Sequence, residues 1–156
     1  MKFLVVTLTM MMIMTITSFP TGSPGCDYSP THGHQTAPQS ASTPHNVKFN
    51  KTELDDGKFV LTMQSDIECP AESVYVENIV TGFLVKTTAR GYFMDTEGVH
   101  VPRCEDWRTK AVTHIDRKAK ANIRIEFMPH YTETYEPDFI IILVRDFSTF
   151  WVDIIV

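Results

Sequence analysis

The chain has 156 residues, of which 14 are Lys or Arg and 19 are Asp or Glu, and its formal net charge at pH 7 is −5. An acidic chain repels nucleic-acid phosphates and anionic lipid headgroups, so the charge argues against a nucleic-acid partner and against charge-driven membrane binding. The length suits one domain of ordinary size.

The first 18 residues are typical of a secretory signal peptide. Lys2 precedes a run, residues 3–16, that is apolar except for threonines, and the small residue Ser18 follows it. This run is shorter than the roughly 20 residues that span a bilayer. We therefore expect cleavage after Ser18 rather than an uncleaved membrane anchor. The mature chain, residues 19–156, should be extracellular, without membrane insertion, and more acidic because Lys2 is lost.

Three cysteines, Cys26, Cys69 and Cys104, remain in the mature chain. Thiols outside the cell normally form disulfides. An odd number therefore leaves one cysteine free or paired with a second chain. The Asn-Lys-Thr sequence that begins at Asn50 is an N-glycosylation sequon, and export would make Asn50 available for glycosylation.

Residues 19–46 are rich in Pro, Gly, Ser and Thr and contain few large apolar side chains. Such a segment buries too little surface to order itself, so we expect an irregular N-terminal arm that is held by another part of the chain. His32 and His34 in the arm could both face a metal ion. Stable sites use three or four ligands, however, and exposed loop histidines are the simpler interpretation. We predict no metal site and no cofactor.

Short apolar-rich runs separated by turn signals follow from Val47 onward, and none keeps a helical period. In residues 121–129, apolar Ile123, Ile125 and Phe127 alternate with charged residues, which predicts a half-buried strand. Residues 138–147 are apolar nearly throughout and are typical of a central strand covered on both sides. The expected strand regions are 47–53, 58–64, 75–94 (one or two strands), 111–115, 121–129, 138–147 and 149–156.

Seven or eight short strands over residues 47–156 predict an all-β domain of the immunoglobulin-like β-sandwich class, with a barrel as the alternative. A helix over residues 104–123 is a further alternative, although its apolar positions are sparse. We identify no nucleophilic serine motif, Cys–His arrangement or phosphate-binding loop, and therefore predict that the chain is not an enzyme. Aromatic residues in expected loops are better candidates for ligand binding, because they stack on sugars and anchor partners. They are Trp107, Tyr131 and Tyr135, whereas Phe150 and Trp151 should close the core.

Several phrases together resemble the Reeler domain, above all the small secreted insect haemolymph defence proteins of the noduler-like group. They are FPTGSPGC at 19–26 with a proline and a His-Gly pair shortly after it, TGFLVKT at 81–87, Cys104 with Thr-His nine residues later, and FSTFWV at 147–152. The resemblance covers essentially the whole mature chain, so the arm belongs to the same domain as the expected sandwich.

The resemblance implies an immunoglobulin-like sandwich and a disulfide between Cys26 and Cys104 that fastens the arm. It also implies a secreted innate-immunity protein of the haemolymph. Such a protein would bind microbial surface polysaccharide, such as β-glucan, or lipopolysaccharide, and act with the haemocyte surface in nodule formation. An extracellular matrix or adhesion module without microbial specificity is the alternative, and direct antimicrobial killing fits the acidic charge poorly. Cys69 lies outside the family pattern and would give a disulfide-linked dimer if it paired with another chain.

Overall fold

The computed structural model describes residues 22–23, 26, 37–40, 43–44, 46–66, 80–130, 136–146 and 149–156. Within these ranges the chain forms nine β-strands and no helix, so no described helix is available to cross a membrane. The strands are β1 (Val47–Glu53), β2 (Phe59–Ser65), β3 (Gly82–Thr87), β4 (Gly91–Phe93), β5 (Val99–His100), β6 (Lys110–His114), β7 (Asn122–Pro129), β8 (Ile140–Val144) and β9 (Phe150–Ile155).

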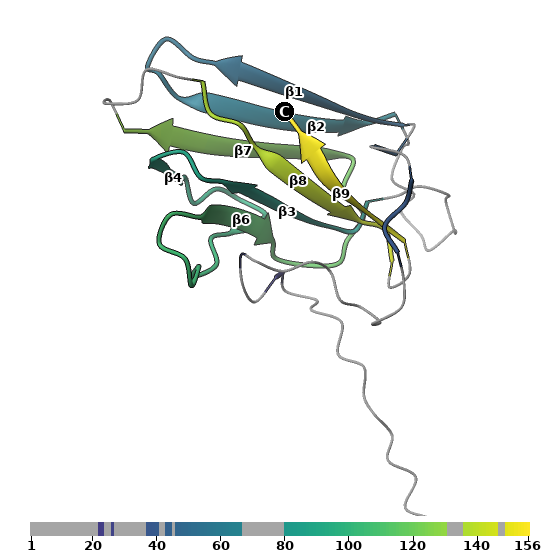
Figure 1. Ribbon diagram of the computed structural model, residues 1–156. Helices are drawn as coiled ribbons and strands as arrows, with labels where there is room; N and C mark the ends of the chain where they lie inside the picture. Colours follow the sequence, from purple (N-terminus) through teal and green to yellow (C-terminus); the bar gives the residue numbers. More distant parts are fainter. Residues whose placement is uncertain are drawn as a thin grey trace, which may run out of the picture.

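The strands form two antiparallel sheets that pack face to face (Figure 1). The first sheet has the order β1-β2-β7-β4 and the second has the order β5-β6-β3-β8-β9. The chain changes sheet after β2, β3, β4, β6 and β7, so its connections gather at the two ends of the sandwich. The expected all-β sandwich is therefore confirmed, and the segment for which a helix was the alternative contains β6 instead.

A three-residue turn joins β1 to β2 and sets their pairing. The amide of Leu54 donates to the Lys58 carbonyl at 2.8 Å, and the amide of Gly57 donates back to Leu54 at 2.9 Å. Gly57 has a φ of 77°, which a residue with a side chain adopts at a cost. This geometry is typical of a hairpin whose glycine takes the left-handed position, and it gives β1 an unbroken antiparallel register with β2 from Val47 to Glu53.

The first sheet separates polar and apolar side chains by the alternation of its strands. On β7, Ile123, Ile125 and Phe127 are buried and Arg124 is exposed, as the sequence predicted. The outward Glu126 carboxylate is 2.9 Å from Arg124 Nη2 and 3.2 Å from Lys58 Nζ. The outer face of this sheet is therefore held by polar and charged contacts.

Aromatic rings fill the space between the sheets. Phe127 is fully buried, and its ring meets those of Phe93 and Phe139 edge-to-face at centroid distances of 5.1 and 5.4 Å. Phe150 and Trp151 are 3% and 4% exposed, which confirms that they are core residues. A separate cavity of about 10 Å³ lies between the sheets, lined mainly by apolar side chains such as Phe49, Leu61 and Ile141, with room for no more than about one water molecule. This interior cavity is too small for a ligand.

One strand differs from the sequence prediction, whereas another region agrees with it. The described part of residues 75–94, from Val80 on, contains two strands, β3 and β4, separated by a bend at Ala89 and Arg90, which is the two-strand form of the prediction. The short strand β5 was not predicted. Its two residues carry no periodic signal, and β5 exists because Val99 and His100 pair with the end of β6.

Candidate functional site

The outer face of the second sheet carries a small apolar cluster of its own. Leu84 on β3, Ala111 on β6 and Ile142 on β8 are buried there together with Cys26 from the arm. A β8 strand buried on both faces confirms the expectation of a central, doubly covered strand. The arm thus covers the outer face of a sheet that would otherwise expose these apolar residues to water.

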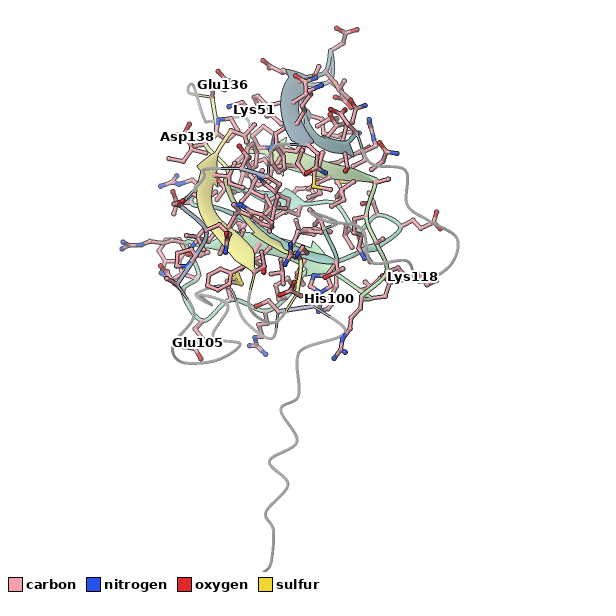
Figure 2. The ribbon with its side chains drawn as sticks, turned by 90° about the vertical axis from the view of Figure 1, so that its right-hand side faces the viewer. Lys51, His100, Glu105, Lys118, Glu136 and Asp138 are labelled. Carbon is pink, nitrogen blue, oxygen red and sulfur yellow. A yellow bond between two sulfur atoms is a disulfide. The ribbon has the colours of Figure 1, made fainter. Side chains whose placement is uncertain are left out.

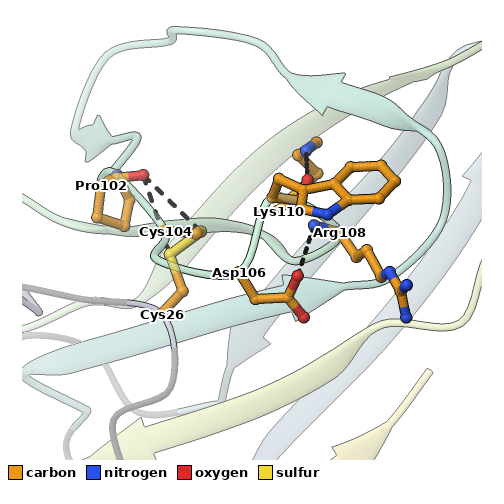
Figure 3. Close-up of a disulfide and its surroundings, with 7 residues drawn as sticks. Cys26, Pro102, Cys104, Asp106, Arg108 and Lys110 are labelled. Carbon is orange, nitrogen blue, oxygen red and sulfur yellow. Dashed lines mark hydrogen bonds between the residues drawn. A yellow bond between two sulfur atoms is a disulfide. The ribbon is translucent and has the colours of Figure 1, made fainter.

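A disulfide between Cys26 and Cys104 fastens the arm to this face, which confirms the pairing implied by the family resemblance (Figure 3). The two Cα atoms are 5.1 Å apart across a sequence separation of 78, and both sulfur atoms lie 4.0 Å from the Pro102 carbonyl oxygen. Closing a loop of this length in the unfolded chain is worth about 4.5 kcal/mol in the chain-entropy model. The bridge therefore contributes a large share of the stability of a domain of this size.

The start of the arm docks on β6 through backbone contacts. The amide of Ser23 donates to Thr113 Oγ1 at 3.1 Å, and this hydroxyl donates to the Phe83 carbonyl at 2.7 Å. Gly22 has a φ of 99°, and a Cβ at this position would lie 2.6 Å from Thr113 Cγ2. A glycine is required here both by the backbone conformation and by the space.

The segment that follows the disulfide presents an aromatic side chain to solvent. Trp107 is 73% exposed. Asp106 accepts the Arg108 amide at 2.9 Å through its Oδ1 and the Thr109 amide at 3.1 Å through its carbonyl. Lys110 Nζ donates to the Trp107 carbonyl, and the Arg108 guanidinium lies 5.4 Å from the centre of the indole ring. These contacts order the turn from Asp106 to Lys110, which we call the Trp107 loop.

The Trp107 loop lies at one end of the sandwich, the left-hand end in Figure 1. The β1–β2 turn, the β3–β4 bend, the end of β7 and the start of β8 lie at the same end, because β3 ends where β6 and β8 begin. Tyr92, at the start of β4, adds a second exposed aromatic side chain there, 50% exposed. We refer to this set of connections as the loop end.

The predicted binding residues Tyr131 and Tyr135 lie outside the described residues. Their connection leaves β7 at Pro129 and enters β8 at Ile140, so both of its anchor points are at the loop end. Trp107, the remaining predicted ligand-binding residue, thus lies at the end of the sandwich where this connection leaves β7 and enters β8.

At the end of the sandwich opposite the loop end, Lys120 contacts several oxygen atoms of the β6–β7 connection. Its ammonium lies 2.8 Å from Asp116 Oδ1, 3.0 Å from the Asp116 carbonyl and 2.6 Å from the Lys118 carbonyl. The hydrogen bond from Lys120 lowers the pKa of the Asp116 carboxyl. These contacts stabilise the conformation of the β6–β7 connection, so we interpret the cluster as structural.

No group of three potential metal ligands occurs within the described ranges. His114 is half-buried, and its Nδ1 lies 3.0 Å from the Phe83 amide nitrogen. His100 and His130 are exposed, whereas His32, His34 and His45 lie outside the described residues, as does Cys69.

The sequence did not indicate the residues that support Trp107. Arg108 and Lys110 read as ordinary surface charges, although an aspartate at the start of a turn that binds the amide two residues later is a recognised turn signal. Gly22 and Thr113, which seat the arm, were also missed, because their contact joins positions about 90 residues apart.

The fold and the covalently fastened arm define a class of protein: a disulfide-stapled, immunoglobulin-like β-sandwich. The Reeler domain model matches residues 25–155. The chain therefore belongs to the Reeler domain family, whose members occur in extracellular proteins such as F-spondin.

Solved structures give the same result for the fold. The Reelin-N domain of F-spondin superposes with a TM-score of 0.54 at 11% identity, covering 79% of this chain and 90% of that domain. The human F-spondin reeler domain gives a TM-score of 0.53 at 10% identity, covering 80% of this chain and 93% of that domain. At this identity the similarity concerns the fold alone. A search of curated proteins found no match.

Proposed function

We propose that this Reeler domain is a secreted, non-enzymatic recognition protein of innate immunity, which binds microbial surface polysaccharide or lipopolysaccharide and promotes haemocyte nodulation in the haemolymph. The observation that carries the proposal is the 73% exposure of Trp107 on a turn held by hydrogen bonds beside a disulfide. A large aromatic ring that is open to water can bury its surface against a partner, and indole faces stack well on sugar rings.

The electrostatics favour short-range contacts over long-range attraction. The chain is acidic, and lipopolysaccharide is anionic, so overall charge does not draw them together. Binding would instead use stacking on Trp107 and hydrogen bonds from Arg108 and neighbouring loop groups, and it would depend only weakly on salt. This expectation separates the proposal from charge-driven membrane killing, which strengthens as salt is lowered.

The test is retention of the mature protein on washed microbial cells, β-glucan and lipopolysaccharide, compared with Trp107→Ala and Trp107→Phe. Losing the ring should weaken retention about 5- to 150-fold, which corresponds to a contact worth about 1–3 kcal/mol, whereas phenylalanine should keep much of it. Ile115→Ala, at the opposite end of the sandwich, is the matched control for loss of an exposed apolar side chain. Equal retention of wild type and Trp107→Ala would remove Trp107 from the site, and no retention of wild type would reject microbial recognition.

An extracellular matrix or adhesion module is the second candidate. It is favoured by the structural neighbours, which are domains of F-spondin. Under this hypothesis the loop end would bind a host surface, and haemocytes or matrix would retain the protein when microbial cells do not. A haemocyte aggregation assay with and without microbial polysaccharide distinguishes the two candidates, because the first predicts aggregation only when the polysaccharide is present and the second predicts it in both cases.

A further inference from the structure

β1 is the outermost strand of the first sheet as described, and it is long and regular. Its seven residues pair with β2 without a break. The other outermost strands are either short, with three residues in β4 and two in β5, or partly covered, since the Gln39 amide donates to the Phe150 carbonyl of β9 at 2.8 Å. A long, flat edge strand invites pairing with another chain unless the protein protects it.

The backbone groups that face outward from β1 can be identified. The Val47 amide donates to Pro44 rather than to β2, whereas the Leu54 amide bonds the facing Lys58 carbonyl. Because bonded and non-bonded positions alternate in an antiparallel pair, the amides and carbonyls of Phe49, Lys51 and Glu53 are directed away from β2. Within the part of the chain that the structure describes, these residues form the free edge of the first sheet.

The sequon occupies the middle of this strand. Asn50 and Thr52 are both exposed and lie on the outer face of the sheet, and Asn50 Nδ2 is 3.2 Å from Thr52 Oγ1. Lys51, between them, points to the opposite side, where its Nζ is 3.1 Å from Glu136 Oε1 and 3.3 Å from the Pro137 carbonyl (Figure 2). The side chain of Lys51 is only 16% exposed. The contacts of Lys51 thus hold β1 in place, and the side chain of Asn50 is exposed to solvent.

The surroundings of Asn50 are suited to a glycan. Its partner across the sheet is Thr62, which in turn faces Arg124 on β7. These neighbours are polar, so a bound sugar would displace water without covering an apolar surface. Asn50 lies between Phe49 and Lys51, whose backbone groups are directed away from β2. A sugar chain on Asn50 would therefore also occupy the space that a pairing strand needs.

We propose that Asn50 carries an N-linked glycan that shields the free edge of β1 and keeps a second copy of the chain from pairing there. In the transfer, a bond forms between Asn50 Nδ2 and C1 of the first sugar, and the C1–O bond to a lipid-linked pyrophosphate donor breaks. The lipid pyrophosphate leaves with the bonding electrons, and Nδ2 loses one proton to the transferase. The inference goes beyond microbial recognition and requires only that the chain is exported.

The first experiment tests the glycan on full-length protein secreted from insect cells. Peptide mapping should show a hexosamine-rooted glycan on the Asn50 peptide, and enzymatic deglycosylation should leave aspartate at that position. Thr52→Ser should keep the glycan, whereas Thr52→Ala and Asn50→Gln should lose it. An unmodified Asn50 peptide in the secreted wild type overturns the proposal.

The second experiment tests shielding by light scattering across a concentration series. Asn50→Gln should shift from monomer toward dimer, while wild type and Thr52→Ser stay monomeric. Adding Glu53→Pro to Asn50→Gln should restore the monomer, because proline removes an outward amide without breaking a bond to β2. Circular dichroism checks that each variant is folded. An Asn50→Gln variant that stays monomeric at every concentration, or a dimer that Glu53→Pro does not affect, overturns the shielding role.

Discussion

Removing the disulfide by the double substitution Cys26→Ser and Cys104→Ser should destabilise the domain strongly. The bridge closes a loop with a sequence separation of 78, and the chain-entropy model gives about 4.5 kcal/mol for such a loop at 25 °C. Domains of this kind unfold with about 5–15 kcal/mol. We therefore expect the variant to lose at least about a third of its unfolding free energy.

The size of the loss also reports whether the arm stays in place. Leu84 and Ile142 are 4% and 5% exposed beneath it. If the unbridged arm left the sheet, each of these side chains would lose about 1.5–3 kcal/mol of burial. A loss near 4.5 kcal/mol therefore indicates an arm held by its remaining contacts, such as the Ser23 amide to Thr113, and a greater loss indicates release.

The assay is urea unfolding followed by tryptophan fluorescence, with Cys69→Ser as the control that leaves the bridge intact. Buried Trp151 should dominate the change in emission. The double variant should show a lower midpoint and a steeper dependence on urea, since an unbridged unfolded chain exposes more surface. A loss no greater than the roughly 0.5 kcal/mol typical of surface substitutions would refute the argument that the bridge stabilises the fold.

The remaining predictions concern the core and two ion pairs. Phe127→Ala should lower the unfolding free energy by about 3–5 kcal/mol in the same urea assay, because it empties the centre of the core. Hydrogen bonds from Arg124 and then Lys58 lower the pKa of Glu126, so its stabilisation is present above the ordinary glutamate pKa and is lost as pH falls. Glu126→Gln should therefore flatten the decline of stability below about pH 4.5, which pH-dependent unfolding measures. Lys120→Met should speed hydrogen exchange in residues 115–121 and cost about 1 kcal/mol.

Strands with regular alternation were predictable from the sequence because their signal is local. On β7, each residue faces water or the core according to its own position, and the pattern Ile123, Ile125, Phe127 records this directly. The strand β5 could not be predicted in this way. It is held by pairing with β6, as in His100 against Thr113, and that pairing depends on the whole fold.

The candidate site was predictable only in part. A tryptophan in a loop flanked by charges is a reasonable candidate for exposure, and Trp107 is exposed. Its supports depend on the exact path of the turn, which places Lys110 Nζ on the Trp107 carbonyl and the Arg108 guanidinium beside the ring. The disulfide pairing came from the family resemblance, because three cysteines allow three pairings and their spacing does not choose among them.

The two faces of the sandwich differ in a way that limits where a ligand can bind. The arm covers the apolar outer face of the second sheet, and polar side chains together with the proposed glycan at Asn50 occupy the outer face of the first. The interior cavity is too small for a ligand. Among the described residues, the proposed recognition therefore falls to connections at the ends, and the loop end offers Trp107 and Tyr92.

Because the strands rather than these connections build the core, stability and binding should respond to different substitutions. Trp107→Ala should change retention on polysaccharide while altering the unfolding free energy by no more than about 0.5 kcal/mol. A core substitution as mild as Ile125→Val should do the opposite, costing about 0.5–1.5 kcal/mol while leaving retention unchanged at temperatures where the variant is folded. If both variants lost binding and stability in proportion, binding would depend on the stability of the whole sandwich rather than on the Trp107 side chain. The assignment of recognition to the loop end would then be wrong.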